Sequence, residues 1–534
     1  MKRAALGLAA LLAACTVGPD YRRPSPSAVP VAYKELAGWK PGTPSDTLDR
    51  GAWWSVYNDP VLDGLERQVA ISNQTLRAQE AAFRLAVATV AVARSQLFPT
   101  VATTASVQRS SRGSGGVSGG TTTLTSPSLG VGSAGVGTTG TGLAGTGVNT
   151  LTTTSTRTGS SLGGTRTSTS FSLEGTVDWE LDLWGRIRRQ IEGDVSLAQA
   201  SAADVANARL SAQAQLAIDY FELRAADSLA ALLDQTVRDY REALRIAENQ
   251  YNVGVAARGD VITAQTQLAG AQASFVNVGV QRATLEHAIA VLAGRAPADL
   301  TIPPETLPAR VPVVPPGVPS ELLERRPDVA AAERTMSAQN AQIGVAIAAF
   351  YPTVTLSALF GYVGDPVQSL VQAANRLWSL GASASESLFE GGARTAAVAA
   401  ARASYEEAVA TYRQTVLTAF EGVEDELSSL RVLADEATAE DEAVALARRA
   451  VQIALNEYRA GTQPYTTVIT AQNTLLTNEQ AALTVRQDRF VASVTLIEDL
   501  GGGWGATDLP SRNSLQTFDP LLPWSHVPYS TPGP

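Results

Sequence analysis

Two long stretches of the chain alternate apolar residues at spacings of three and four, the pattern of helices that pack along a coiled-coil seam. The first runs from about 186 to 250 without a proline; a helix of that length would span roughly 95 Å. The second runs from about 393 to 458. The seam positions are Leu229, Leu233, Val237, Tyr240, Leu244, Ala247 and Tyr251, then Val444, Ala447, Val451, Ala454 and Tyr458. With a further helical pattern over about 61–96, these stretches predict a mainly α protein.

The period changes to two residues in four shorter segments, which predicts strands at about 98–110, 168–183, 353–363 and 377–390. The segments come in two pairs, so each pair would form one β-hairpin. Aromatic residues such as Trp179 and Trp378 lie near the strand ends. This placement suits a membrane β-barrel, in which aromatic side chains sit at the lipid interfaces. A soluble sheet has the same periodicity, so the alternation alone leaves both possibilities open.

The chain contains a two-fold internal repeat. The stretch Tyr251–Leu268 recurs as Tyr458–Leu475, with eight of eighteen positions identical at an offset of 207. In both copies a helical pattern stops at Gly254 or Gly461, where a left-handed residue ends a helix. We therefore expect two helix–turn–helix tips, one in each copy.

The repeats cover about 61–296 and 321–504, each with a β-hairpin and long coiled-coil helices. The first copy also contains a Gly/Ser/Thr-rich insertion over about 111–166. Such a composition cannot bury a core, so we expect a mobile loop there. A Pro-rich linker over 297–320 joins the copies, and a Pro-rich tail covers 505–534.

The N-terminus resembles a bacterial lipoprotein signal. A basic start and a short apolar run lead to Leu12-Ala13-Ala14-Cys15, so residues 1–14 are expected to be a signal peptide, with lipidation at Cys15. An ordinary secretory signal that happens to contain a cysteine is the alternative. Residues 15–60 then read as an extended, partly Pro-rich segment.

Composition and the lack of certain motifs argue against several classes of function. The 534 residues carry a net charge of −10 and lack basic clusters, which argues against nucleic acid as a partner. The two histidines, His287 and His526, lie far apart without nearby ligand clusters, so we expect no metal site. No phosphate loop or nucleophile elbow is present, and we interpret Glu424–Asp425–Glu426 as a solvated helix face. We therefore expect neither an enzyme nor a cofactor.

Several motifs together resemble the outer-membrane efflux factor family of the TolC/OprM type, in its NodT-like lipoprotein branch. They cover nearly the whole mature chain and are Cys15-TVGPDYRRP, WWSVYNDPVLDGL, LFPTV, WELDLWGRIRR, VPSELLERRPDVAAAE, YRAGTQPYTTVITAQ and GGGW. The resemblance implies a homotrimer whose protomers each contribute four strands to a twelve-stranded outer-membrane barrel, above an α-helical periplasmic tunnel. It also implies the outer membrane of a Gram-negative bacterium, with lipid around the barrel.

The function that the resemblance implies is the passive exit duct of a tripartite efflux pump for drugs or other small toxic compounds. A periplasmic adaptor and an inner-membrane transporter of the RND type would be its partners. The alternatives are the exit duct of a type I protein secretion system and a non-pore outer-membrane stalk or adhesin.

Site residues are implied by the same resemblance. Tyr458, Gln463, Thr467 and Thr470 match family positions that close the periplasmic end. Gly254, Asp260 and Gly461 mark the tips that would contact the adaptor. The family often has acidic residues where this chain has Thr467 and Thr470, whereas Asp260, which matches Thr467 in the first copy, keeps a carboxylate.

Overall fold

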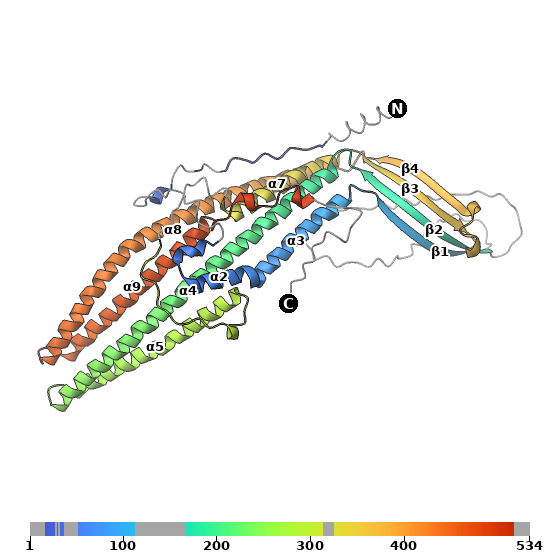
Figure 1. The fold of residues 1–534 in the computed structure, drawn as a ribbon. Helices are drawn as coiled ribbons and strands as arrows, with labels where there is room; N and C mark the ends of the chain where they lie inside the picture. The colour runs from blue at the N-terminus through green and yellow to red at the C-terminus, as the bar shows by residue number, and fades with distance from the viewer. Residues whose placement is uncertain are drawn as a thin grey trace. The chain divides into compact units, whose positions relative to one another are not determined.

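The computed structural model describes residues 16–26, 29, 33–36, 52–112, 166–312 and 325–516. The chain separates into two compact units (Figure 1). The sheet unit consists of the described parts of 99–179 and 355–383, and the helical unit contains the remainder. Cys15, the expected signal peptide and the core of the expected mobile loop lie outside the described residues.

The sheet has four strands in the order β1-β2-β3-β4. Their bounds are Thr100–Arg112, Arg166–Leu181, Thr353–Gly364 and Arg376–Ser385. The last strand is shorter than its alternation predicts. Gly391 and Gly392 adopt positive φ angles of 60° and 90° to turn the chain into the next helix, so the residues just before them leave the ladder.

The paired strands β1 and β2 separate apolar from polar side chains. Their antiparallel register opposes Val101 to Val177, Ala105 to Leu173 and Val107 to Phe171 on one face. The other face carries hydroxyl and charged groups, and Ser106 Oγ lies 2.7 Å from Ser172 Oγ. Val101 and Val107 are exposed despite being apolar. This hairpin therefore presents an uncovered apolar face and a polar face.

The helices occur in matched pairs. α4 (Arg186–Asn252) and α8 (Ala393–Arg459) have 67 residues each, and α5 (Arg258–Leu292) and α9 (Tyr465–Asp499) have 35 each. α3 (Gln74–Ser95) and α7 (Pro327–Ala348) have 22 each. The repeat seen in the sequence is thus present as equal helices. No helix in the described ranges is long and apolar enough to cross a membrane.

The helical pattern expected over 61–96 is divided in the structure. α2 (Pro60–Ser72) and α3 meet at Asn73, whose backbone is extended, with φ −62° and ψ 122°. The Asn73 Oδ1 atom accepts a hydrogen bond of 2.9 Å from the Leu76 backbone N–H, which caps α3. A continuous helix was therefore the wrong expectation, because the asparagine side chain offers the backbone a capping bond in its place.

The two long helices bury most of their predicted seams. All five seam positions of α8, from Val444 to Tyr458, are buried. In α4, Leu233, Val237, Tyr240 and Ala247 are buried, but Tyr251 is 44% exposed. A hydrophobic core joins the middle of α4 to the last third of α9 (Tyr465–Asp499), where the Phe221 and Phe490 rings stack with their centroids 4.6 Å apart.

Two repeat-related arginines hold segments outside the helical hairpins against the long helices. Arg224 of α4 is 2% exposed and donates from Nη1 to the Pro303 carbonyl at 2.6 Å. Its counterpart Arg431 of α8 donates from Nη2 to Glu35 Oε2 at 2.7 Å. Each copy thus uses the same helix position to hold a chain segment that crosses it.

The carboxylates of 424–426 do not form a uniformly solvated face. Glu424 accepts hydrogen bonds from the backbone N–H groups of Lys34 and Glu35 at 2.7 and 3.0 Å. Burial, followed by the carboxylates of Asp499 and Asp425, raises the pKa of Glu426 to about 7. Only Asp425 of the three is exposed. The earlier interpretation of this run is therefore wrong for Glu424 and Glu426, because neighbouring segments cover them.

Candidate functional site

The tips of the two helical hairpins have the same backbone design. Gly254 and Gly461 end α4 and α8 with φ angles of 78° and 73°. In each, a backbone N–H bonds back five residues, from Val255 to the Gln250 carbonyl at 2.9 Å and from Thr462 to the Glu457 carbonyl at 3.0 Å. This is the Schellman arrangement, which requires a residue in the left-handed region. The structure thus has a turn at each tip that the sequence predicted.

The two tips pack against each other inside one chain (Figure 1). The Gln250 side chain donates from Nε2 to the Tyr458 carbonyl at 2.8 Å, which links the end of α4 to the end of α8. A hydrophobic cluster, which we call the tip core, joins all four long helices. Its buried members are Ala243, Ile246, Ala247, Ala264, Ala454, Tyr458, Tyr465 and Val468.

Tyr458 lies in the tip core rather than on the surface. It is 3% exposed, and its ring centroid lies 5.1 Å from that of Tyr465. Burial, and then the neighbouring Asp260 carboxylate, raises the pKa of Tyr458 to about 12. The structure therefore brings together two of the sequence-predicted residues, Tyr458 of α8 and Asp260 of α5.

The other predicted gate residues lie along the start of α9. Gln463 is exposed in the turn, and Thr467 is half-buried, with its backbone N–H donating to the Pro464 carbonyl at 3.1 Å. Thr470 is exposed, and its hydroxyl donates to the Thr466 carbonyl at 2.9 Å. Within the part of the chain that the structure describes, no hydrogen bond joins these three side chains to Tyr458. Gln463 and Thr470 are thus presented outward from a single protomer, whereas Thr467 is partly covered.

Sequence reasoning missed two residues at this end of the molecule. Tyr465 is 2% exposed and fills the tip core beside Tyr458. The repeat gave no signal for it, because the matching position in the first copy is Arg258. Asn473 of α9 accepts at Oδ1 from Tyr240 at 3.3 Å and from Gln267 at 3.1 Å. It therefore connects the second hairpin to both helices of the first.

The segment that follows Cys15 is fixed to the opposite end of the helical unit. The Val17 N–H donates to the Trp184 carbonyl at 3.1 Å. Arg189 donates to the Val17 and Gly18 carbonyls, each at 3.3 Å. A Cβ atom on Gly18 would lie 2.5 Å from Gly344 Cα, so this approach requires glycine. The first described residues therefore lie beside the start of α4.

The described residues contain no group of three or more metal-ligating side chains. What the site offers is two identical turns, a buried aromatic pair and a row of neutral hydroxyl and amide groups. Such an arrangement can pack and can contact another protein.

Comparison with known proteins gives consistent matches. A sequence profile described as "Outer membrane efflux protein" matches residues 148–295 and 318–502. The toluene efflux pump outer membrane protein TtgC of Pseudomonas putida is 27% identical, over 92% of this chain and 94% of its own length. The outer membrane protein OprJ of Pseudomonas aeruginosa is 28% identical, over 94% and 97%. The solved structure of the outer-membrane channel OprN is 30% identical, with a TM-score of 0.76 over 92% of this chain and 100% of that one.

Proposed function

The chain belongs to the outer membrane efflux protein family, and from this premise we propose that it is the exit duct of a tripartite efflux pump in the outer membrane. It would carry small toxic compounds passively across the periplasm and the outer membrane. The observation that carries the proposal is the pairing of two equal helical hairpins with strands that have one apolar and one polar face. A membrane barrel needs strands with an apolar face toward lipid and a polar face toward the lumen. A periplasmic tunnel needs long helices to form its wall.

The substrate class follows from the relatives. The similar protein TtgC is named for toluene efflux. A duct of this kind selects little by itself, so small apolar toxic compounds are the substrates to test first. An adaptor would contact the tips around Gly254, Asp260 and Gly461, and an inner-membrane RND transporter would deliver the compounds.

A closed ring of copies follows from the internal repeat. Within one chain α4 packs on both α3 and α7, and α7 packs on both α4 and α8. Since α3 matches α7 and α4 matches α8, the junction of α4 with α7 has a counterpart between α8 and α3. The described residues of one chain do not pack α8 substantially on α3. A second copy would supply that junction, and the family resemblance gives three copies.

The α8 side of the junction that a single chain leaves unfilled carries exposed apolar residues. Leu388 and Phe389, just before α8, are 95% and 90% exposed. At the matching junction inside the chain, the Trp184 ring stacks on that of Tyr351 at 4.9 Å and its Nε1 donates to the Pro352 carbonyl at 2.8 Å. Tyr351 corresponds to Phe98 through the offset of 253. Trp184 corresponds to Gly391 through the offset of 207. Phe389 lies two residues before Gly391 and would therefore lie near Phe98 of the neighbouring copy.

Disulfide cross-linking tests this junction. The chain has one cysteine, Cys15, so the double variant Phe98→Cys/Phe389→Cys introduces the only pair at the interface. We expect a reduction-sensitive trimer band from oxidised membranes. The two single variants are the matched controls and should remain at the monomer position on a denaturing gel. A double variant that behaves like the single ones would contradict the proposed ring.

Conductance and export test the function itself. The purified protein should form ion-conducting pores in a planar bilayer, as a stalk or adhesin would not. Expressed with a cognate adaptor and transporter in a host that lacks its own duct, it should restore resistance to toluene. Pores without restored resistance, but with secretion of a protein through a type I system, would favour the secretion alternative.

The lipid anchor is tested separately. Mass spectrometry of the mature N-terminus should find an acylated Cys15, and Cys15→Ala should abolish the modification. An unmodified N-terminus at another residue would contradict lipidation and would leave the duct proposal standing.

A further inference from the structure

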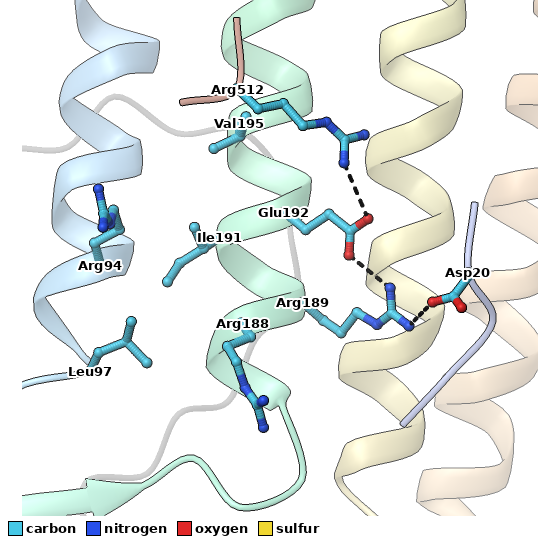
Figure 2. Close-up of a pocket in the computed structure, with 9 residues that line it drawn as sticks. All are labelled: Asp20, Arg94, Leu97, Arg188, Arg189, Ile191, Glu192, Val195 and Arg512. Atoms are coloured by element: carbon cyan, nitrogen blue, oxygen red, sulfur yellow. Dashed lines mark hydrogen bonds and ion pairs between the residues drawn. The ribbon is translucent and has the colours of Figure 1, made fainter. Parts of the chain in front are cut away.

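A pocket at the start of α4 is lined by four arginines from three separate segments (Figure 2). It has a volume of about 480 Å³ and lies wholly in the helical unit. Figure 2 shows α3 on one side, the first turns of α4 in the middle, and Asp20 beside Arg189. The arginines are Arg94 of α3, Arg188 and Arg189 of α4, and Arg512 of the C-terminal segment.

The carboxylates around the pocket are largely engaged. Arg189 donates from Nη1 to Glu192 Oε2 at 2.7 Å and from Nη2 to Asp20 Oδ1 at 2.8 Å. Arg188 is paired with Asp182, with 3.1 Å between Nε and Oδ2. The four guanidinium groups thus face three carboxylates, which leaves an excess of positive charge.

The excess charge is carried by Arg94 and Arg512. The Arg94 Nη1 atom is buried and has no hydrogen-bond partner within the described ranges. Among the residues that the structure describes, Arg512 has only a long contact to Glu192, with 3.9 Å between Nη1 and Oε1. A buried charged donor without an acceptor is costly, since it has lost water and gained nothing in return. Arg94 lines the pocket, so a small rotation of its guanidinium would bring this unpartnered donor onto an anionic oxygen there. The same oxygen would give Arg512 a closer acceptor.

The remaining wall of the pocket is apolar. Leu97, Ile191 and Val195 line it, so the pocket combines guanidinium donors with a hydrocarbon surface. Arginine is well suited to phosphate because its planar donors match two phosphate oxygens. A pocket of this size is within the range that holds a small-molecule ligand.

We propose that this pocket binds the phosphate ester of an anionic phospholipid, with Arg94 and Arg512 as phosphate ligands and the apolar wall against the glycerol and the first acyl carbons. The choice of a lipid rests on the proposed function. α3 ends at Ser95, shortly before β1 begins at Thr100, and α4 begins at Arg186, shortly after β2 ends at Leu181. If the strands span the membrane, the pocket lies within a few residues of its periplasmic surface.

Lipid binding to the full chain, purified in detergent and depleted of lipid, tests the proposal. Phosphatidylglycerol is added, and retained lipid is measured by native mass spectrometry. We expect Arg94→Gln to lower the affinity about tenfold, the ratio that corresponds to the loss of one charged hydrogen bond. The control is Arg84→Gln, an exposed arginine on the same helix, which should bind as the wild type does. Equal affinities in the two variants would overturn the proposal.

Two further ligands distinguish the source of the phosphate. Diacylglycerol, which lacks the phosphate, should not be retained, and inorganic phosphate should displace phosphatidylglycerol only at far higher concentration. Retention of diacylglycerol would mean that the pocket recognises only hydrocarbon. Displacement by phosphate at equal concentration would mean a site for the free anion. Either result would overturn the lipid assignment.

Thermal unfolding separates ligand binding from a structural role. Without lipid, Arg94→Gln should unfold at or above the wild-type temperature, because it removes a half-buried guanidinium whose Nη1 atom has no acceptor. The rise caused by phosphatidylglycerol should shrink. If Arg94→Gln fails to fold, Arg512→Gln takes its place, and undiminished lipid affinity in that variant would overturn the proposal. Neither result depends on conductance, so failure here leaves the proposed duct untouched.

Discussion

At the scale of single residues, one buried guanidinium determines how the linker leaves the first repeat. Arg224 donates to the Pro303 carbonyl and, at 2.9 Å, to the Tyr220 hydroxyl, and its charge lies beside Asp227. Asp227 also accepts from Arg282 Nε at 2.7 Å. The linker is therefore held by a network in which each buried polar group has a partner, and such networks are strongly destabilised when one member is removed.

Replacement of Arg224 should be costly. Arg224→Gln leaves the Pro303 carbonyl and the Tyr220 hydroxyl without their donor, although Asp227 keeps its pair with Arg282. We expect it to lower the free energy of unfolding by about 3 kcal/mol, since each buried group left unsatisfied costs about 1–3 kcal/mol. Arg238→Gln is the control, because Arg238 forms an exposed ion pair with Asp234 on the same helix. It should cost about 1 kcal/mol or less. Denaturant unfolding measures both, and equal losses would contradict the assigned network.

Glu426 should make stability depend on pH near neutrality. Because burial raises its pKa to about 7, the folded chain binds this proton more tightly than the unfolded chain does. Stability should therefore fall as the pH rises from the ordinary range of a glutamate to about 7, and remain level above that. Glu426→Gln should unfold at a higher temperature than the wild type at pH 8, with a smaller difference at pH 5.

Glu421→Gln, an exposed carboxylate on the same helix, is the control for that measurement. Its unfolding temperature should follow that of the wild type at every pH. If Glu426→Gln also ran parallel to the wild type, the buried carboxyl would not be the titrating group.

The sequence identified single residues where the backbone or a repeat demanded them. Gly254 and Gly461 were predictable because a helix that ends in a left-handed residue needs glycine. Tyr465 and Asn473 were not, since their importance comes from partners distant in the chain. The repeat matches Arg224 to Arg431 but does not show what either arginine binds. No spacing along one helix reveals that an arginine will meet a carbonyl of a linker.

At the scale of secondary-structure elements, the tip turns are set by their glycines. A side chain at a φ of 73° or 78° is strained, because Cβ approaches the carbonyl oxygen. Gly461→Ala and Gly254→Ala should each lower the free energy of unfolding by about 1–2 kcal/mol. Gly270→Ala is the control, since Gly270 lies inside α5 with open space around it, and should stabilise by about 0.5–1 kcal/mol.

Thermal or denaturant unfolding of the three variants checks this ordering. A destabilising Gly270→Ala would mean that an unseen neighbour occupies that space. Tip variants as stable as the wild type would show that the turns can rearrange without the left-handed residue.

The long helices and the strands could be predicted as elements, and a mainly helical protein with one sheet is confirmed. The residues at which these elements end depend on side-chain caps and turns, which the hydrophobic period does not reveal. The asparagine side chain at Asn73 interrupts a pattern that remains helical on both sides. The residues before Gly391 leave the fourth strand because the chain must turn into α8. The alternation of apolar and polar residues continues beyond Ser385, where the fourth strand ends.

At the scale of the whole molecule, the two copies share one design but diverge where they meet. Equal helix lengths and identical caps repeat across the offset of 207. At the tip core, however, Tyr458 is buried while its counterpart Tyr251 is 44% exposed. The second hairpin therefore contributes the Tyr458 ring to the contact between the two repeats of one chain. The Tyr251 ring of the first hairpin remains partly exposed. A ring of three chains would alternate these two kinds of hairpin around the axis.

This asymmetry bears on the proposed gate. Thr467 and Thr470 stand on the hairpin whose tyrosine is buried, and the Thr470 hydroxyl is satisfied by its own helix. These two threonines contribute no charge of their own to the proposed constriction. Thr467→Asp/Thr470→Asp would place up to six carboxylates of a trimer near the axis. Fixed like charge in a narrow pore focuses the field, so the variant should pass cations in preference to anions.

Reversal potentials in a planar bilayer under a KCl gradient measure that preference. The control is Thr484→Asp, an exposed threonine with the same hydroxyl bond to its own helix. It lies about 21 Å further along α9 at 1.5 Å per residue, well beyond the Debye length of about 8 Å at physiological salt. It should shift the reversal potential little, because charge placed so far from the tips is screened at the constriction. If the double variant behaved like this control in both selectivity and conductance, Thr467 and Thr470 would cap and pack the start of α9 without lining the narrowest part of the pore.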